Sequence, residues 1–174
     1  MTATVERSAA VTLRGRKVTL IGPELRAGDT APPFTVLAPD MTPVTIGDLP
    51  GRVRLLSSVP SLDTEVCDLE TRRFDEEAAR LEGLSVLTVS VDLPFAQQRW
   101  VSAADVRNVR TASDHRDLAF GHAYGVAVKD LRLLARAVFV VAADNTIRHV
   151  EYVPEIGAHP DYDAVLRAVR AELG

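Results

Sequence analysis

Apolar residues are concentrated in short continuous segments of the chain, separated by longer segments in which they recur at helical spacing. Residues 84–91 (LSVLTVSV) and 135–142 (ARAVFVVA) are almost continuously apolar and β-branched, which is typical of strands covered on both faces of a sheet. Residues 53–59 predict a third strand. Residues 147–153 predict a fourth, which returns antiparallel after a turn at Asp144-Asn145. The pattern predicts a central sheet with two buried faces.

Four further segments predict helices, at residues 66–81, 95–104, 118–124 and from 160 onward. Both the first and the last of them are expected to pack one apolar face on the sheet. In the first helix the apolar positions are Leu69, Phe74, Ala78 and Leu81. In the last helix they are Tyr162, Val165, Leu166, Val169 and Leu173.

The chain begins with two short β-rich segments, residues 11–13 and 17–21, which predict an N-terminal β-hairpin at about 11–21. Residues 34–37 and 43–46 are expected to pair weakly in the proline-rich region that follows. Helical crossovers join parallel strands, and the late hairpin adds an antiparallel edge. The order of elements therefore predicts an α/β protein with a thioredoxin-like three-layer sandwich, forming a single domain over residues 1–174.

Composition excludes several classes of partner. A chain of 174 residues with 47% hydrophobic and 25% charged residues fits one globular domain with a substantial core. The net charge of −4 gives no overall basic field, so we expect no nucleic acid and no membrane as partners. We see neither a signal peptide nor an apolar stretch of roughly 20 residues, and we expect a cytoplasmic protein.

The chain contains one cysteine, Cys67. An internal disulfide, a zinc site built on cysteine pairs and a CxxC redox couple are therefore excluded. A lone cysteine is either a small buried hydrophobe or a reactive thiol, and the residue by itself leaves both readings open. The four histidines are scattered at unrelated spacings, so we expect no metal site.

The surroundings of Cys67 support the reactive thiol without deciding between the two readings. The predicted strand 53–59 ends at Pro60, a polar loop follows, and a helix begins with Cys67 in its first turn. A helix N-terminus favours the ionised form of a thiol. Thr64 lies three residues before the cysteine, where its hydroxyl can turn toward the sulfur.

Two carboxylates close to Cys67 argue in the opposite direction. Asp68 and Glu70 are expected to stabilise the helix start but to oppose ionisation of the thiol. A cation is therefore needed nearby. The candidates are Arg72 and Arg73 on the same helix, and Arg136 at the start of the strand 135–142.

These segments resemble a known family. Pro60-x-x-x-Thr64-x-x-Cys67 matches the PxxxTxxC motif of the peroxiredoxins. Together with DLPFAQ at residues 92–97 and ARAVFV at residues 135–140, in that order, it resembles the bacterial thiol peroxidases, an atypical two-cysteine peroxiredoxin subfamily. The resemblance extends from about residue 11 to the C-terminus.

The resemblance implies a thiol-dependent peroxidase that reduces hydrogen peroxide and organic hydroperoxides without a cofactor. Cys67 would attack the peroxide and become a sulfenic acid. Thr64 would hydrogen-bond the thiolate and the peroxide, Arg136 would stabilise the thiolate and the developing alkoxide, and Pro60 would shield the pocket from water. The family also implies a homodimer.

Two departures from the family pattern change this picture. The subfamily places a resolving cysteine after DLPFAQ, where this chain has Val101, and Glu65 replaces a usual proline. Sulfenic acid must then be resolved by an external thiol or a thioredoxin-like reductant. The alternative is a redox-sensing or binding module with a peroxide-reactive cysteine and little turnover. A thioredoxin-type disulfide reductase is excluded because it needs two cysteines.

Overall fold

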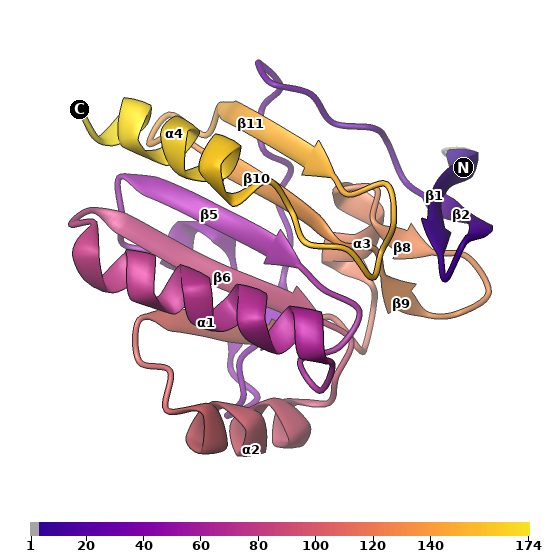
Figure 1. Cartoon of the computed structure of the whole chain (residues 1–174), viewed down its shortest axis with the longest axis horizontal. Helices are drawn as coiled ribbons and strands as arrows, with labels where there is room; N and C mark the ends of the chain where they lie inside the picture. The colour runs from indigo at the N-terminus through magenta and orange to yellow at the C-terminus, as the bar shows by residue number, and fades with distance from the viewer. Residues whose placement is uncertain (1–3) are drawn as a thin grey trace.

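The centre of the molecule is a mixed sheet of seven strands in the order β11-β10-β5-β6-β7-β3-β4 (Figure 1). The structure is a computed structural model and describes residues 4–174. The three strands β5, β6 and β7 are parallel, and β10 and β11 add an antiparallel edge. The strands are β3 (Val36–Leu37), β4 (Pro43–Val44), β5 (Val53–Ser58), β6 (Leu84–Ser90), β7 (Val109–Ser113), β10 (Ala137–Val141) and β11 (Ile147–Tyr152).

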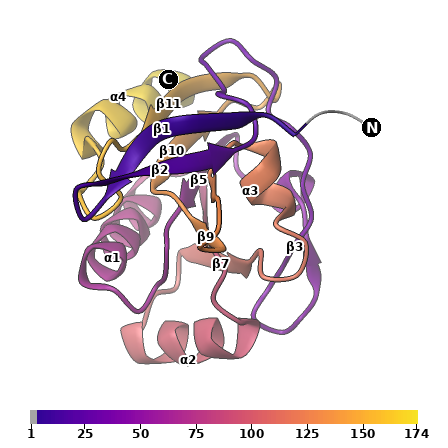
Figure 2. The same ribbon diagram turned by 90° about the vertical axis from the view of Figure 1, so that its right-hand side faces the viewer.

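Helices cover both faces of this sheet, and its central strands are therefore buried. Every residue of β5 and β10 is buried. The helices α1 (Glu65–Arg80) and α4 (Tyr162–Leu173) lie on one face, and α3 (Ala119–Ala123) lies on the other (Figure 2). The helix α2 (Pro94–Ala104) packs beside β7. The α/β sandwich predicted from the hydrophobic pattern is confirmed, and no helix in residues 4–174 is long and apolar enough to cross a membrane.

A second, smaller sheet contains the N-terminal hairpin. Its order is β1-β2-β8-β9, and the antiparallel hairpin of β1 and β2 is longer than predicted. Its strands are β1 (Glu6–Leu13), β2 (Arg16–Ile21), β8 (Ala127–Val128) and β9 (Leu133–Leu134), and a 3-10 turn spans Ile46–Asp48 in the connection from β4 to β5. The strands β7, β8 and β9 were not predicted, because β7 (VRTAS) mixes polar and apolar residues and the other two have only two residues each.

The predicted apolar face of α1 is only partly correct. Phe74 is fully buried, but Leu69 is 48% exposed and contributes little to the core. The buried positions of α1 are Cys67, Glu70, Thr71 and Phe74, which recur at spacings of three and four residues. Polar side chains therefore occupy part of the face of α1 that meets the sheet.

The larger part of the core lies on the α3 face and contains a cluster of aromatic rings. Phe120 and Tyr124 stack with their ring centroids 4.3 Å apart. Phe139 from β10 meets the ring of Tyr124 edge-on at 5.0 Å, and Phe34 meets Phe120 edge-on at 5.1 Å. These contacts attach α3 and the segment before β3 to the central sheet.

Replacing a ring in this cluster is expected to destabilise the protein strongly. Phe139→Ala removes a fully buried ring, and a loss of about 3–5 kcal/mol in the free energy of unfolding follows from the lost burial and the cavity left behind. Phe95→Ala is the matched control, because Phe95 is 70% exposed and its loss is expected to stay within about 0.5 kcal/mol. Urea unfolding of both variants measures the difference. Similar losses would contradict the assignment of the core.

Candidate active site

Cys67 lies at the carboxyl end of the central strand β5, in the first turn of α1. The strand ends at Ser58, a loop from Val59 to Asp63 follows, and Thr64 is the residue that caps the helix. The side chain of Cys67 is fully buried and packs with Val59 and Leu62. The predicted position of the cysteine, in the first turn of a helix that follows a buried strand, is thus correct.

Two donors are directed at the sulfur of Cys67. The hydroxyl oxygen Oγ1 of Thr64 lies 2.6 Å from Sγ, and Nη2 of Arg136 lies 3.1 Å from it. Oγ1 of Thr64 also lies 3.1 Å from the carbonyl oxygen of Ser61. A hydroxyl carries one proton, so Thr64 donates to the sulfur when the sulfur is ionised and is free to donate to the Ser61 carbonyl when it is a thiol.

The guanidinium of Arg136 is only 1% exposed and uses each of its three nitrogens. Besides Nη2 at the sulfur, Nε donates to the carbonyl oxygen of Ile156 at 2.9 Å, and Nη1 forms an ion pair with the carboxylate of Glu70. Burial by itself lowers the pKa of Arg136, but Glu70 and Cys67 outweigh it and raise that pKa above its ordinary value. Arg136 therefore keeps a positive charge beside the sulfur.

The two carboxylates that were expected to oppose ionisation of the thiol are both engaged by arginines, Glu70 by Arg136 and Asp68 by Arg72. Glu70 is fully buried and holds Arg136 instead of facing the sulfur, and Ser57 donates a second hydrogen bond to it at 2.7 Å. Burial raises the pKa of the Glu70 carboxyl, although Arg136 and Ser57 act in the opposite direction. Asp68 accepts a hydrogen bond from Nε of Arg72 at 2.8 Å. Glu70 lies three residues after Cys67 and four before Phe74, so it shares their face of the helix. That spacing is the feature of the sequence that could have predicted its burial.

Of the three candidate cations, only Arg136 contacts Cys67. Arg72 is engaged by Asp68, and Arg73 lies 4.1 Å above the ring of Tyr162. Both arginines thus belong to the packing of α1 against its neighbours.

The loop before the helix is held by Asp92, which the sequence analysis did not single out. Its carboxylate accepts hydrogen bonds from the hydroxyl of Ser61 at 2.7 Å, the amide of Leu62 at 2.8 Å and the hydroxyl of Ser90 at 2.7 Å. Asp92 is the second residue after β6, which is parallel to β5, so both loops emerge at the same edge of the sheet. The loop that leads to Thr64 and Cys67 is thereby attached to the neighbouring strand.

A pocket of about 420 Å³ opens beside these residues. Pro60, Thr64 and Arg136 line it, together with Glu65 at its polar side. Its remaining walls are mostly apolar and come from four separate segments, with Leu13, Val66, Leu133 and Ile156 among them. The four residues expected at the site, Pro60, Thr64, Cys67 and Arg136, are therefore brought together in space.

Val101, at the position where the resemblance implies a second cysteine, lies on α2. It is half-buried, and the helix that carries it is attached to α1 by a hydrogen bond of 3.0 Å from Nε1 of Trp100 to Asp68. The chain has no other cysteine to meet an oxidised Cys67. Within residues 4–174 no group of three histidine, cysteine or acidic side chains is arranged to hold a metal ion.

Comparison with known proteins assigns the family. The redoxin family model matches residues 26–166. The thiol peroxidase of Halalkalibacterium halodurans is 58% identical over 165 residues, which cover 95% of this chain and 99% of that protein. The thiol peroxidase of Bacillus subtilis is 48% identical over 163 residues, or 94% of this chain and 98% of that protein.

Solved structures agree with this assignment. A peroxiredoxin-like protein from Aquifex aeolicus superposes with a TM-score of 0.87 at 41% identity, covering 94% of this chain and 98% of the other. Fold and site thus define a thioredoxin-like protein with a buried cysteine at a helix start. The chain belongs to the redoxin family, and among its members it groups with the thiol peroxidases of the peroxiredoxin class.

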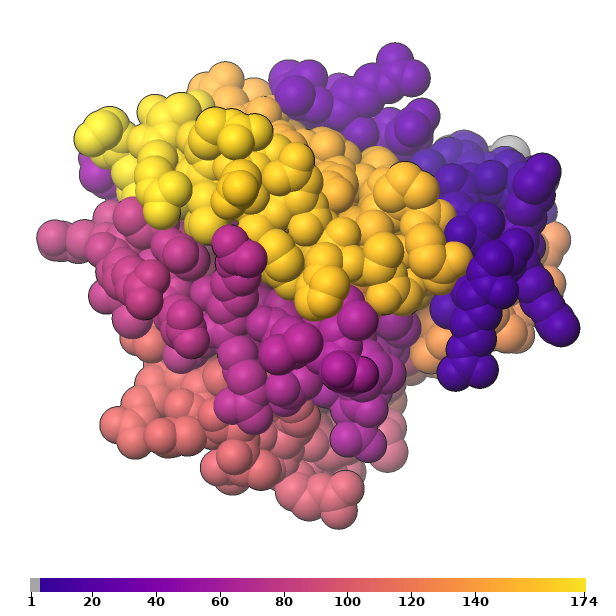
Figure 3. Space-filling view, in the orientation of Figure 1, coloured from indigo at the N-terminus to yellow at the C-terminus, as the bar shows by residue number. Residues whose placement is uncertain are grey.

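Glu155 fixes the N-terminal hairpin beside the pocket. Its carboxylate accepts hydrogen bonds from the hydroxyl of Thr12 at 2.7 Å and from the amides of Arg14 and Gly15 at 3.0 and 3.1 Å. The space-filling view shows the indigo hairpin against the yellow segment that follows β11 (Figure 3). The Thr12 hydroxyl and then the amides of Gly15 and Gly157 lower the pKa of Glu155 to about 2.

The Glu155 carboxylate is expected to make the free energy of unfolding depend on pH in the acid range. The folded pKa of about 2 lies below the ordinary 4.5, so the contribution of Glu155 is present above pH 4.5 and is lost as the pH falls toward 2. Glu155→Gln cannot titrate at this position. The difference in unfolding free energy between the wild type and this variant is expected to shrink across that window, as urea unfolding at a series of pH values would measure. A difference that stays constant with pH would contradict the assignment.

Proposed function

We propose that this protein reduces hydrogen peroxide and organic hydroperoxides at Cys67 and is returned to the reduced state by an external thiol. The observation that carries the proposal is the pair of donors, Thr64 and Arg136, directed at one buried sulfur. A purely structural cysteine needs neither a buried guanidinium nor a hydroxyl at its sulfur. Relatives named thiol peroxidase, 48–58% identical over most of the chain, support the same activity.

The first step breaks the peroxide bond. The thiolate of Cys67 attacks one oxygen, an S–O bond forms, and the O–O bond breaks with its electron pair moving to the second oxygen. That oxygen takes up a proton and leaves as an alcohol or water, and Cys67 becomes a sulfenic acid. Arg136 and Thr64 donate toward the place where negative charge shifts from sulfur to oxygen, which is how fixed donors lower such a barrier.

Glu70 acts in this scheme by positioning Arg136. A guanidinium is a planar fork of donors, and the ion pair at Nη1 together with the Ile156 carbonyl at Nε leaves Nη2 directed at the sulfur. Pro60 forms part of the pocket wall, carries no amide hydrogen, and limits the access of water to the sulfur. No cofactor takes part in this scheme.

The second half of the cycle requires a partner. With Val101 in place of a second cysteine, the sulfenic acid cannot be resolved within the chain, so a small thiol or a thioredoxin-like protein completes the turnover. The close similarity to proteins named thiol peroxidase argues against the redox-sensing alternative. We also propose a homodimer that works in the cytoplasm, by analogy with the family, without nucleic acid or membrane as partners.

The proposed function is tested by replacing the sulfur. A hydroxyl stays protonated at neutral pH and cannot attack, so Cys67→Ser is expected to abolish peroxide consumption. The reduced wild type is expected to consume one equivalent of peroxide and yield a sulfenic acid that dimedone traps, which mass spectrometry measures. Thiol-dependent activity that persists in Cys67→Ser, beyond the rate of thiol and peroxide alone, would refute the proposal.

Removing either donor is expected to slow the peroxide step without removing the nucleophile. For Thr64→Val and Arg136→Ala we expect a loss of about 10²-fold or more in the second-order rate constant, by analogy with loss of one oxyanion donor. Stopped-flow measurements with hydrogen peroxide and an alkyl hydroperoxide give this constant. Arg73→Ala is the matched control, because Arg73 lies on the same helix and does not contact Cys67. Equal rates in Arg136→Ala and Arg73→Ala would mean that the guanidinium plays no part in the reaction.

A further inference from the structure

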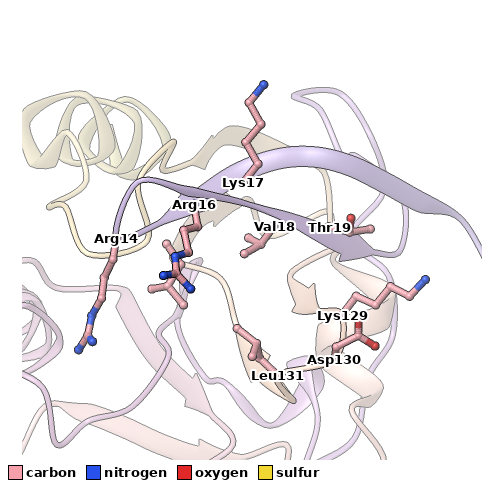
Figure 4. Close-up of a pocket in the computed structure, with 9 residues that line it drawn as sticks. Arg14, Arg16, Lys17, Val18, Thr19, Lys129, Asp130 and Leu131 are labelled. Carbon is pink, nitrogen blue, oxygen red and sulfur yellow. The ribbon is translucent and has the colours of Figure 1, made fainter.

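A cavity of about 710 Å³ lies below the N-terminal hairpin, and Cys67 is not among the residues that line it (Figure 4). It is formed between the hairpin and the connection from β8 to β9. Its walls include Arg14, Arg16, Val18, Lys129 and Leu131. A cavity of this size matches small-molecule sites, which commonly span about 300–1,000 Å³.

Two arginines give this cavity its charge. Arg14 and Arg16 extend to the same side of the hairpin, while Lys17 points to the opposite side (Figure 4). Over residues 4–174 neither guanidinium forms an ion pair or a side-chain hydrogen bond, whereas Lys129 is already paired with Glu6. Asp130 is the one carboxylate among the lining residues, and it lies beside Lys129 at the far end from Arg14. The end of the cavity below the hairpin turn thus presents two unpartnered cations on a protein whose net charge is −4.

The cavity adjoins the pocket at Cys67. Leu13 and Arg14 line both spaces, so a molecule that extends past Arg14 enters the active-site pocket. The inner walls of that pocket are mostly apolar, with Pro60, Leu133 and Ile156 among them. A carboxylate is disfavoured against such walls but is favoured beside two exposed guanidinium groups.

We propose that the external thiol is a small, carboxylate-bearing molecule whose carboxylates bind Arg14 and Arg16 while its sulfur reaches Cys67. This inference rests on the proposed function and names the chemical class of the reductant. The incoming thiolate attacks the sulfenic sulfur, an S–S bond forms, and the S–O bond breaks as hydroxide leaves and is protonated to water. A second thiol then attacks the mixed disulfide, which releases a small-molecule disulfide and returns Cys67 to its thiol.

The test uses a matched pair of probes, glutathione and its diethyl ester, which share one thiol and differ in their carboxylates. Protein with Cys67 already converted to sulfenic acid is mixed with each probe, and dimedone quenching reports the rate at which sulfenic acid disappears. The measured quantity is the rate with glutathione divided by the rate with the diethyl ester, determined for each protein. Intrinsic differences between the two thiols cancel when this ratio is compared between proteins. In the wild type we expect this ratio to fall as salt is added, because exposed charge pairs are screened.

Arg16→Gln is expected to lower the ratio by about fivefold, the size expected for loss of one or two exposed charge pairs. Arg167→Gln is the matched control, since it removes an exposed cation on α4, away from the hairpin, and is expected to leave the ratio unchanged. A ratio that is the same in the wild type and Arg16→Gln, or insensitive to salt, overturns the proposal.

Two further outcomes separate this inference from the proposed function. If peroxide gives no dimedone-reactive sulfenic acid in the wild type, the proposed function fails, and the reductant site fails with it. A different result is that sulfenic acid forms normally, but Arg16→Gln slows its reduction by an acidic thioredoxin-type protein and not by glutathione. The hairpin then binds a protein partner. That result overturns the small-molecule site and leaves the peroxidase intact.

Discussion

The buried guanidinium of Arg136 is the contact on which the site depends. An unpaired charge in a protein interior is costly, and this one is stable because three acceptors surround it. The sulfur of Cys67 and the carboxylate of Glu70 come from α1, and the carbonyl oxygen of Ile156 comes from the segment after β11. The same three contacts that satisfy the arginine hold the start of α1, the residue before β10 and the segment after β11 in one place. Stability and reactivity are therefore linked at this residue.

The sheet places these groups in contact. β10 runs antiparallel to β5, with Ala137 opposite Ser58, so the residue before β10 lies beside the residues that lead out of β5. Arg136 thereby contacts Cys67 in the first turn of α1. Asp92, which follows the parallel strand β6, holds the loop before Thr64. Arg136 is buried, and Thr64 lies at the exposed start of α1 after a short loop that Asp92 anchors, which restricts the movement of both groups relative to the sulfur.

Loss of a second cysteine divides the catalytic cycle between this chain and its surroundings. The peroxide step needs only groups that the chain supplies, all within the buried site around Cys67. The resolving step needs an incoming sulfur, and the chain can influence it only through the shape and charge of the entrance. Three features form that entrance: the apolar pocket beside Pro60, the N-terminal hairpin that Glu155 fixes, and Arg14 and Arg16 at the turn of this hairpin.

The sequence by itself determined the buried strands, the long helices and the reactive cysteine, because these follow from local periodicity and from a motif of eight residues, PxxxTxxC, that is contiguous in the chain. The family resemblance also singled out Arg136 as the cation at the sulfur, although position along the chain alone left Arg72 and Arg73 as further candidates. The sequence placed Glu70 close to the cysteine, but only the structure shows that its carboxylate pairs with the buried guanidinium of Arg136. The pairing of β8 with the N-terminal hairpin, the anchoring by Asp92 and the cavity below the hairpin arise from contacts over long sequence separations. Only the tertiary structure decides these, because hydrogen bonding and burial depend on which segments meet.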